Sequence, residues 1–229
     1  MSQTRVFLKL FYWPDNIAEA KAVQLSLKRK VRIAPLKKHP RLIAALDASF
    51  IDDKAIGVAC LYRYPELALL ECSHAFQKTA FPYIPGYLTF REGPALVSAL
   101  EGLKIRPDLI LVDGQGIAHP KGMGIASHLG VLLDIPSIGC AKSRLVGEFV
   151  EPGPNRGDWT HLRYNGKIVG AVLRTRDHVK PVFVSPGHRI DLKTAIEIIL
   201  VCMRKYRIPE PLRKADSVTK SIKREFSAL

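Results

Sequence analysis

The stretch Leu109-Ile110-Leu111-Val112-Asp113-Gly114-Gln115-Gly116 bears most directly on the fold and function of this chain. Its four consecutive apolar residues predict a short strand that is buried on both faces of a sheet. Asp113 follows the strand directly, and open α/β sheets bind ligands at this end of their strands. The glycines let the backbone turn sharply and let a ligand approach closely. Taken alone, the stretch fits a binding site or a simple Asp-Gly turn equally well.

The segments around this strand predict an α/β fold, a mixed β-sheet flanked by helices, in one domain over residues 1–229. Apolar runs at 42–51, 55–64 and 67–76 predict an antiparallel meander. Asn165-Gly166 predicts a second hairpin within 162–174. Further strands are expected at 137–141 and 180–185, and helices at 17–29, 92–103, 123–133, 191–203 and 213–224.

The composition favours a polyanionic partner. The chain has 229 residues, 47% of them hydrophobic, and a formal charge of +14 at pH 7. Such a chain can bury a core, which excludes a disordered protein. The excess positive charge favours nucleic acid as the partner, with an anionic membrane surface second.

The cysteines and the N-terminus bear on the compartment. Cys60, Cys72, Cys140 and Cys202 lie in apolar runs without zinc-ligand spacing, which predicts buried free thiols and a reducing compartment. The first apolar run is too short for a signal peptide or a membrane-spanning helix. We therefore expect a cytoplasmic protein with no membrane partner.

Three carboxylates lie at positions where a negative charge needs a partner: inside a strand, at a helix start and at a strand end. Asp47 lies inside an apolar strand, where a buried charge is costly unless it meets a cation or backbone donors. Glu92 begins a predicted helix, where capping alone would explain it. If the strands of Asp47 and Asp113 are neighbours, the three groups converge, and their oxygens suit Mg²⁺. Such an ion orients water and stabilises a phosphodiester transition state, which predicts nuclease chemistry.

Two further segments could serve a nuclease. Lys142 follows a strand expected beside that of Asp113, where a lysine can hold a phosphate or assist proton transfer, or simply lie at the sheet rim. Pro82 and Pro85 stiffen a loop that presents Tyr83 and Ile84. Such a loop can unstack bases and let one rotate into a pocket. The alternative is a proline-rich turn with Tyr83 packed inward.

The ordered motifs of this chain resemble the endonuclease V family, the deoxyinosine-directed endonucleases, over nearly the whole length. The matching pieces are Leu46-Asp47, Pro82-Tyr83-Ile84-Pro85-Gly86, Phe90-Arg91-Glu92-Gly93-Pro94, Val112-Asp113-Gly114-Gln115-Gly116, His119-Pro120, Ala126-Ser127-His128-Leu129-Gly130, Cys140-Ala141-Lys142-Ser143 and Ser185-Pro186-Gly187-His188.

The resemblance implies a ribonuclease-H-like fold and cleavage that depends on Mg²⁺, with Mn²⁺ able to substitute. The enzyme would cut the second phosphodiester 3′ to deoxyinosine in DNA and leave 3′-hydroxyl and 5′-phosphate ends. By this resemblance, Asp47, Glu92 and Asp113 would bind the metal, and these acids with Lys142 would be catalytic. The loop of Pro82, Tyr83, Ile84 and Pro85 would separate the DNA strands. The pocket for the base would be lined by Gly86, Gly116, Gly124 and Leu145. His119 is a further candidate for substrate binding, although a lone histidine is more often structural.

One position departs from the family pattern. Asp216 ends the segment Pro211-Leu212-Arg213-Lys214-Ala215-Asp216, whose family counterpart often ends in His. Aspartate can still ligate a metal directly or through water, but it titrates differently, so metal preference and pH optimum are open.

Two other functions remain open from the sequence. One is an inosine-specific ribonuclease, or another ribonuclease-H-like structure-specific nuclease, with inosine RNA as its substrate. The other is a nucleic-acid-binding module whose acids are only structural. In each case a monomer is expected.

Overall fold

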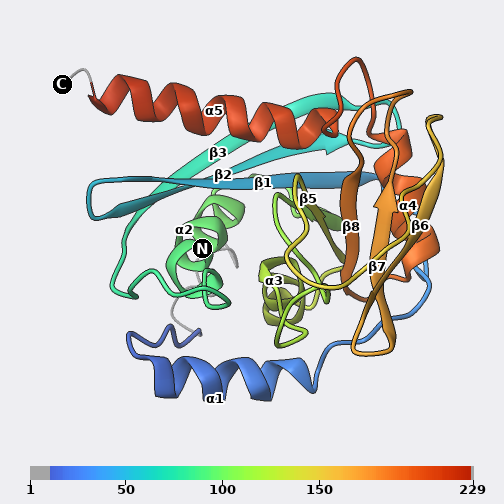
Figure 1. Cartoon of the computed structure of the whole chain (residues 1–229). Helices are drawn as coiled ribbons and strands as arrows, with labels where there is room; N and C mark the ends of the chain where they lie inside the picture. The colour runs from blue at the N-terminus through green and yellow to red at the C-terminus, as the bar shows by residue number, and fades with distance from the viewer. Residues whose placement is uncertain (1–10, 228–229) are drawn as a thin grey trace.

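A computed structural model describes residues 11–227, and all of its strands join one eight-stranded sheet (Figure 1). The strands are β1 (Leu42–Ile51), β2 (Lys54–Arg63), β3 (Ala68–Lys78), β4 (Leu109–Val112), β5 (Ser137–Ala141), β6 (Trp159–Tyr164), β7 (Lys167–Leu173) and β8 (Val182–His188). Their order in the sheet is β3-β2-β1-β4-β5-β8-β7-β6. β4 runs parallel to β1 and β5, and the other pairings are antiparallel. The expected mixed sheet is confirmed.

Helices cover both faces of this sheet. The helices are α1 (Ile17–Lys28), α2 (Thr89–Glu101), α3 (Ile125–Leu133), α4 (Leu192–Val201) and α5 (Glu210–Ser227). Helices α4 and α5 pack on one face, whereas α2 and α3 pack on the other, with α1 outside α3 (Figure 1). No helix within residues 11–227 has the length and apolar composition needed to cross a bilayer.

Strand β4 lies at the centre of the core, as its apolar run predicts. Leu109 and Leu111 point into the core under α4 and α5, while Ile110 and Val112 point into the core under α2 and α3. All four side chains are buried. Burying each stabilises the fold by about 1.5–3 kcal/mol, so the strand that carries Asp113 is rigidly held.

Several element boundaries differ from the predictions for physical reasons. Helix α2 begins at Thr89 rather than near residue 92, so Pro94 lies inside the helix, where its missing N–H removes a helical hydrogen bond. Helix α3 begins at Ile125 rather than 123, since Gly124 is extended and precedes the first turn. Strand β8 runs on to His188 because its pairing with β5 continues through Pro186.

The prediction of four free thiols is wrong for one pair. Cys60 and Cys72 occupy directly opposed positions on β2 and β3, with their Cα atoms 4.2 Å apart, and they form a disulfide. Cys140 and Cys202 are buried free thiols, as expected. The spacing along the sequence does not reveal which cysteines face each other, because the register between two strands decides it. The expectation of a reducing compartment loses part of its basis accordingly.

Candidate active site

Strand pairing brings two of the predicted acids together. Leu46 of β1 is aligned with Val112 of β4 in the parallel pairing, so Asp47 and Asp113 follow at neighbouring positions. The amide of Asp113 donates to the carbonyl oxygen of Leu46 at 3.1 Å, which ties the two chains together at this point. The assumption that these strands are neighbours is confirmed.

Lys142 joins the two acids from the other side of β4. It follows β5, which runs parallel to β4, and its Nζ lies 2.7 Å from Oδ2 of Asp113. Partial burial lowers the pKa of Lys142, but the hydrogen bond and charge of Asp113, with the charges of Asp216 and Asp47, outweigh it and raise this pKa overall. Lys142 therefore carries its charge at neutral pH, and its predicted position is confirmed.

Glu92 belongs to α2, which covers the sheet face opposite to the face covered by α4 and α5. Burial, with the charges of Asp47 and Asp113, raises the pKa of Glu92 to about 8, although the charge of Arg91 lowers it. Glu92 and Asp113 line the same cavity. Helix capping does not account for Glu92, because the N-cap residue of α2 is Leu88 and no side chain makes a capping hydrogen bond there.

Asp47 is held by a helix residue that the sequence did not single out. Asp47 lies on the sheet face covered by α5, and the Thr219 hydroxyl of that helix donates to its Oδ2 at 2.6 Å. Burial, with the charges of Asp113 and Asp216, raises the pKa of Asp47 to about 6, although the Thr219 hydrogen bond lowers it. The spacing of Asp216 and Thr219, three residues apart on one helix, was the available signal for this contact.

The donor set suits a hard divalent cation, but the side chains do not surround one as they stand. Within residues 11–227, no three His, Cys, Asp or Glu side chains lie close enough to hold an ion together. Lys142 and Thr219 occupy oxygens of Asp113 and Asp47, and Lys220 occupies Oδ2 of Asp216 at 2.7 Å. Burial, with the charges of neighbouring carboxylates, raises the pKa of both Asp47 and Glu92, and a bound cation would offset both effects.

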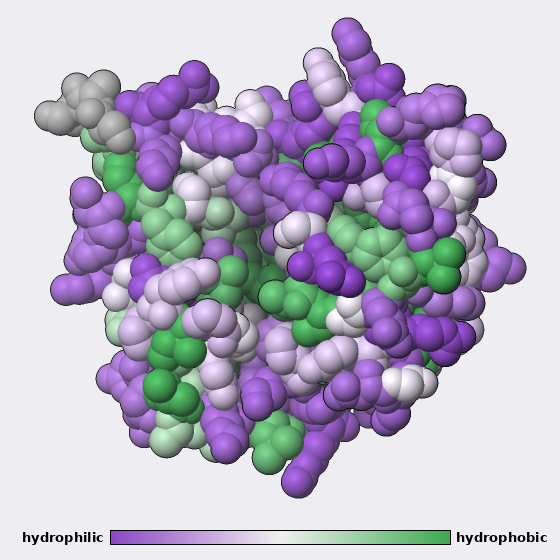
Figure 2. All heavy atoms as spheres, in the orientation of Figure 1, coloured by the Kyte–Doolittle hydropathy of each residue, from purple (hydrophilic) through white to green (hydrophobic). Residues whose placement is uncertain are grey.

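A cavity of about 290 Å³ opens beside these acids. Figure 2 shows the face of the molecule in Figure 1 hollowed beside α2, with hydrophobic residues inside the hollow and hydrophilic ones around it. Tyr83 is 72% exposed, so the alternative of an inward-packed tyrosine is wrong. The predicted residues that line the cavity are Tyr83, Ile84, Pro85, Gly86, Glu92, Asp113, His119, Gly124 and Leu145.

Two of the predicted substrate-binding residues, Pro82 and Gly116, do not line this cavity. The amide of Gly116 donates to Oγ of Ser185 at 2.7 Å, and a Cβ at Gly116 would lie 2.1 Å from the carbonyl oxygen of Pro186. Gly116 is thus required by the close approach of two backbones. Gly124 does line the cavity, although a Cβ there would also meet the Gln115 carbonyl oxygen at 2.3 Å.

His119 lines the cavity and also supports the proline-rich loop. Burial, with the charge of Lys121, lowers the pKa of His119 to about 4, so the ring is neutral. Its Nδ1 accepts the amide of Lys121 at 3.2 Å, which leaves Nε2 to donate toward Gly86. Gln24 of α1 also donates to the Gly86 carbonyl oxygen, at 3.1 Å. The loop that carries Tyr83 is therefore fastened at its end.

Gln115 is a cavity residue whose role the sequence did not predict. It is 7% exposed, and its Nε2 donates to the Ser143 carbonyl oxygen at 3.2 Å. Its Oε1 is buried without a hydrogen-bond partner among the described residues. The only available signal was its place between Gly114 and Gly116. A buried acceptor without a partner is costly, and because this one lies in the wall of the cavity, a ligand there could satisfy it.

Comparisons with known proteins agree with this geometry. The Endonuclease V family model matches residues 25–217. Endonuclease V of Methanothrix thermoacetophila is 52% identical over 206 residues, covering 90% of this chain and 92% of the relative. The structure of Endonuclease V from Streptomyces avermitilis has a TM-score of 0.90 at 39% identity and covers 94% of this chain and 96% of that chain.

A more distant structure contains nucleic acid. Endonuclease V of Ciona intestinalis, solved with a 23mer DNA containing an inosine followed by a ribo-adenosine, has a TM-score of 0.81 at 27% identity. The match covers 91% of this chain and 97% of that chain. Because the family model spans most of the sequence and the relatives are matched almost end to end, this chain belongs to the endonuclease V family of nucleases.

Proposed function

We propose that this nuclease recognises deoxyinosine in DNA and, with a divalent metal ion, hydrolyses the second phosphodiester 3′ to it, leaving 3′-hydroxyl and 5′-phosphate ends. The observation that carries the proposal is the pairing of β1 with β4, which places Asp47 and Asp113 at neighbouring positions, with Nζ of Lys142 2.7 Å from Oδ2 of Asp113. The Ciona relative solved with inosine-containing DNA supports the choice of lesion.

Asp47, Glu92 and Asp113 would hold Mg²⁺ or Mn²⁺, with Asp216 as a fourth candidate ligand. The bound ion supplies orientation of a water nucleophile and stabilisation of charge on the phosphate. Asp47 could offer the ion its Oδ1 while Oδ2 keeps the Thr219 hydroxyl, whereas a cation at Asp113 would repel the Lys142 ammonium from that carboxylate. Lys142, which its acidic neighbours keep charged, is then free to contact a phosphate oxygen.

The hydrolysis itself balances with these groups. Water adds to phosphorus while the bond from phosphorus to the 3′ oxygen breaks. The leaving oxygen needs a proton to become a 3′-hydroxyl, and the ammonium of Lys142 is a donor within the site. The proton of the attacking water passes to a carboxylate or to solvent, so the new 5′ end leaves as a phosphate.

The cavity beside the acids would receive the flipped base. A volume of about 290 Å³ lies at the small end for ligand pockets, which suits one base. Hypoxanthine carries a hydrogen on N1, whereas adenine has an acceptor there. The unpaired Oε1 of Gln115 can accept this N1–H and would repel adenine. Tyr83, exposed on its stiff loop, would fill the space that the base leaves.

A substrate panel tests the proposal. Deoxyinosine duplex, the same duplex without the lesion, and inosine RNA are incubated with Mg²⁺ or with EDTA, and each cut is mapped. We expect Mg²⁺-dependent nicking of the deoxyinosine duplex alone, at the second phosphodiester 3′ to the lesion. Faster cutting of the RNA would reassign the chain as an inosine-specific ribonuclease, and binding without cutting would make it a nucleic-acid-binding module. A monomeric state and a cytoplasmic location stay predictions.

A further inference from the structure

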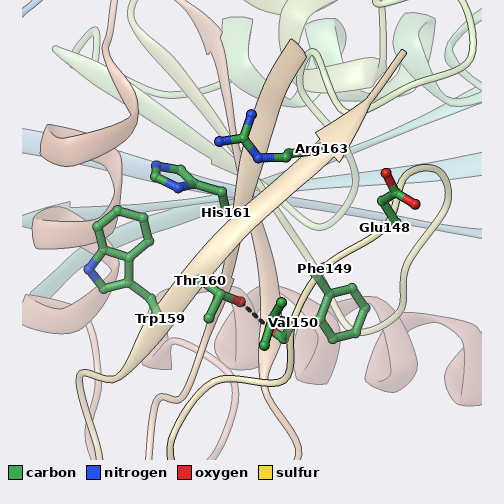
Figure 3. Close-up of a pocket in the computed structure, with 7 residues that line it drawn as sticks. All are labelled: Glu148, Phe149, Val150, Trp159, Thr160, His161 and Arg163. Atoms are coloured by element: carbon green, nitrogen blue, oxygen red, sulfur yellow. Dashed lines mark hydrogen bonds between the residues drawn. The ribbon is translucent and has the colours of Figure 1, made fainter. Parts of the chain in front are cut away.

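A second surface with the chemistry of a nucleic-acid contact lies on β6, the edge strand of the sheet. Trp159, His161 and Arg163 alternate along this strand and are exposed, while Leu162 between them is buried. Figure 3 shows their three side chains on the same side of the strand. The rings of Trp159 and His161 meet edge to face, with centroids 5.0 Å apart. We name this surface, Trp159, His161 and Arg163, the β6 platform.

The β6 platform borders a hollow of about 610 Å³ whose far wall is the segment 148–150. Glu148 and Arg163 exchange two backbone hydrogen bonds, of 2.8 and 2.9 Å, which fix this segment against β6. The Thr160 hydroxyl donates to the Val150 carbonyl oxygen (Figure 3). These bonds hold the segment 148–150 in place beside β6. Within that segment, the side chain of Val150 is 77% exposed.

The hollow is connected to the active-site cavity through one short segment. Arg144 lines the active-site cavity, and its guanidinium lies 5.7 Å from the ring centroid of Phe149, which lines the hollow. Nη1 of Arg144 also donates to the Gly147 carbonyl oxygen at 3.0 Å. Arg144 thus lies between the active-site cavity and the hollow that the β6 platform borders.

The exposed groups on this surface match one ligand class. Flat aromatic rings stack on bases of any sequence, and a guanidinium pairs with phosphate. Among the described residues, the Arg163 guanidinium has neither a hydrogen-bond nor an ion-pair partner. Glu148 is the one opposing charge in the hollow, and Figure 3 shows it on the far side of β6 from Trp159. The net charge of +14 favours a polyanion over a peptide.

We propose that the β6 platform binds single-stranded nucleic acid, with bases stacked on Trp159 and His161 and a phosphate on Arg163. The idea that the bound nucleic acid continues from the catalytic cavity rests on the proposed function. Binding to the β6 platform itself needs neither a lesion nor a metal ion. The proposal also explains why an edge strand exposes a tryptophan. An apolar edge without a partner invites aggregation.

The test uses unmodified oligo(dT) of twelve nucleotides and the full chain in EDTA. We expect base stacking to quench the emission of Trp159 and Trp159→Ala to weaken binding roughly tenfold. Phe226→Ala is the matched control, since Phe226 is 47% exposed and packs on Phe76 of β3, the opposite edge of the sheet. Arg163→Gln should reduce the slope of log affinity against log salt by about 0.7.

A second variant, His161→Ala, keeps the test valid if Trp159→Ala fails to fold by circular dichroism. The proposal is overturned if the folded platform variants bind oligo(dT) as tightly as the wild type and Phe226→Ala, or if binding leaves tryptophan emission unchanged. Because the oligonucleotide carries no deoxyinosine and EDTA removes metal, this outcome says nothing about the proposed cleavage. Conversely, if the wild type does not cut deoxyinosine DNA, the measured binding of oligo(dT) to the β6 platform is still valid.

Discussion

Replacing Glu92 by glutamine should stabilise the metal-free protein increasingly as the pH rises above 4.5 and should weaken its response to Mg²⁺. Burial, with the charges of Asp47 and Asp113, raises the pKa of Glu92 from 4.5 to about 8. Because the pKa is raised on folding, protonated Glu92 contributes its full stability below pH 4.5, and this is lost as the pH rises through about 8. Glutamine keeps the shape of the protonated side chain at every pH.

The size of the effect follows from the raised pKa of Glu92. Ionising the group costs about 1.4 kcal/mol for each pH unit between the two pKa values, which bounds the effect at about 5 kcal/mol at pH 8. The side chain keeps some solvent exposure, and Asp47 titrates alongside it, so we expect roughly half of this bound. Glu92→Gln should therefore be more stable than the wild type by roughly 2 kcal/mol at pH 8 and equal to it near pH 4.5.

The assay is urea unfolding in EDTA at several pH values, repeated at pH 8 with Mg²⁺. Mg²⁺ should stabilise the wild type in proportion to the logarithm of its concentration and leave Glu92→Gln much less affected. Glu197→Gln, an exposed glutamate on α4, is the matched control and should behave like the wild type. A Glu92→Gln protein destabilised equally at all pH values, or stabilised by Mg²⁺ as much as the wild type, would refute the reasoning.

Four further substitutions test the other parts of the site. Asp113→Asn should lower the nicking rate on deoxyinosine duplex at least a thousandfold, on the order of 4 kcal/mol, while gel-shift affinity changes little, because it removes a metal ligand but no base contact. Tyr83→Ala should reduce discrimination between deoxyinosine duplex and normal duplex in competition cleavage without changing stabilisation by Mg²⁺. Gln115→Leu should reduce the preference for deoxyinosine over deoxyadenosine roughly tenfold in kcat/KM, since the acceptor for N1–H is lost. Gly116→Ala should lower the free energy of unfolding by about 3 kcal/mol, measured with urea, because its Cβ would lie 2.1 Å from the Pro186 carbonyl oxygen.

For each substitution, one outcome would contradict the role given to the residue. Normal nicking by Asp113→Asn would remove that residue from the metal site. Unchanged lesion selectivity in Tyr83→Ala or Gln115→Leu would show that the loop or the cavity does not read the base. A Gly116→Ala protein as stable as the wild type would mean that the backbone of β8 yields, and would return Gly116 to the base pocket as the resemblance implies.

The sequence predicted best where one short segment sets its own structure. The apolar run before Asp113 gives a strand buried on both faces whatever its neighbours are. Asn165 and Gly166 both adopt positive φ and form the hairpin turn expected of this pair. Asp191 caps α4 by accepting the Thr194 amide at 2.7 Å. In each case, the local chemistry and the final structure agree.

Features that depend on how distant segments meet could not be predicted. The Cys60–Cys72 disulfide follows from the register of two strands, which no spacing rule gives. Thr219 reaches Asp47 only because α5 crosses the face of β1. The glycine at 116 suggested a ligand, but its α-carbon packs against β8. A glycine required by another backbone and one required by a ligand look the same in a sequence.

The most direct test of the central claim is a crystal structure with Mn²⁺, located by its anomalous scattering. The claim is that the pairing of β1 with β4 builds a metal site at the end of β4. It predicts a peak about 2.0–2.3 Å from carboxylate oxygens of Asp47 and Asp113, with Glu92 as a further direct or water-mediated ligand and the Lys142 ammonium turned away from Asp113. A protein that cuts deoxyinosine DNA with Mn²⁺ but shows the ion elsewhere, with the ion pair of Lys142 and Asp113 intact, would contradict it.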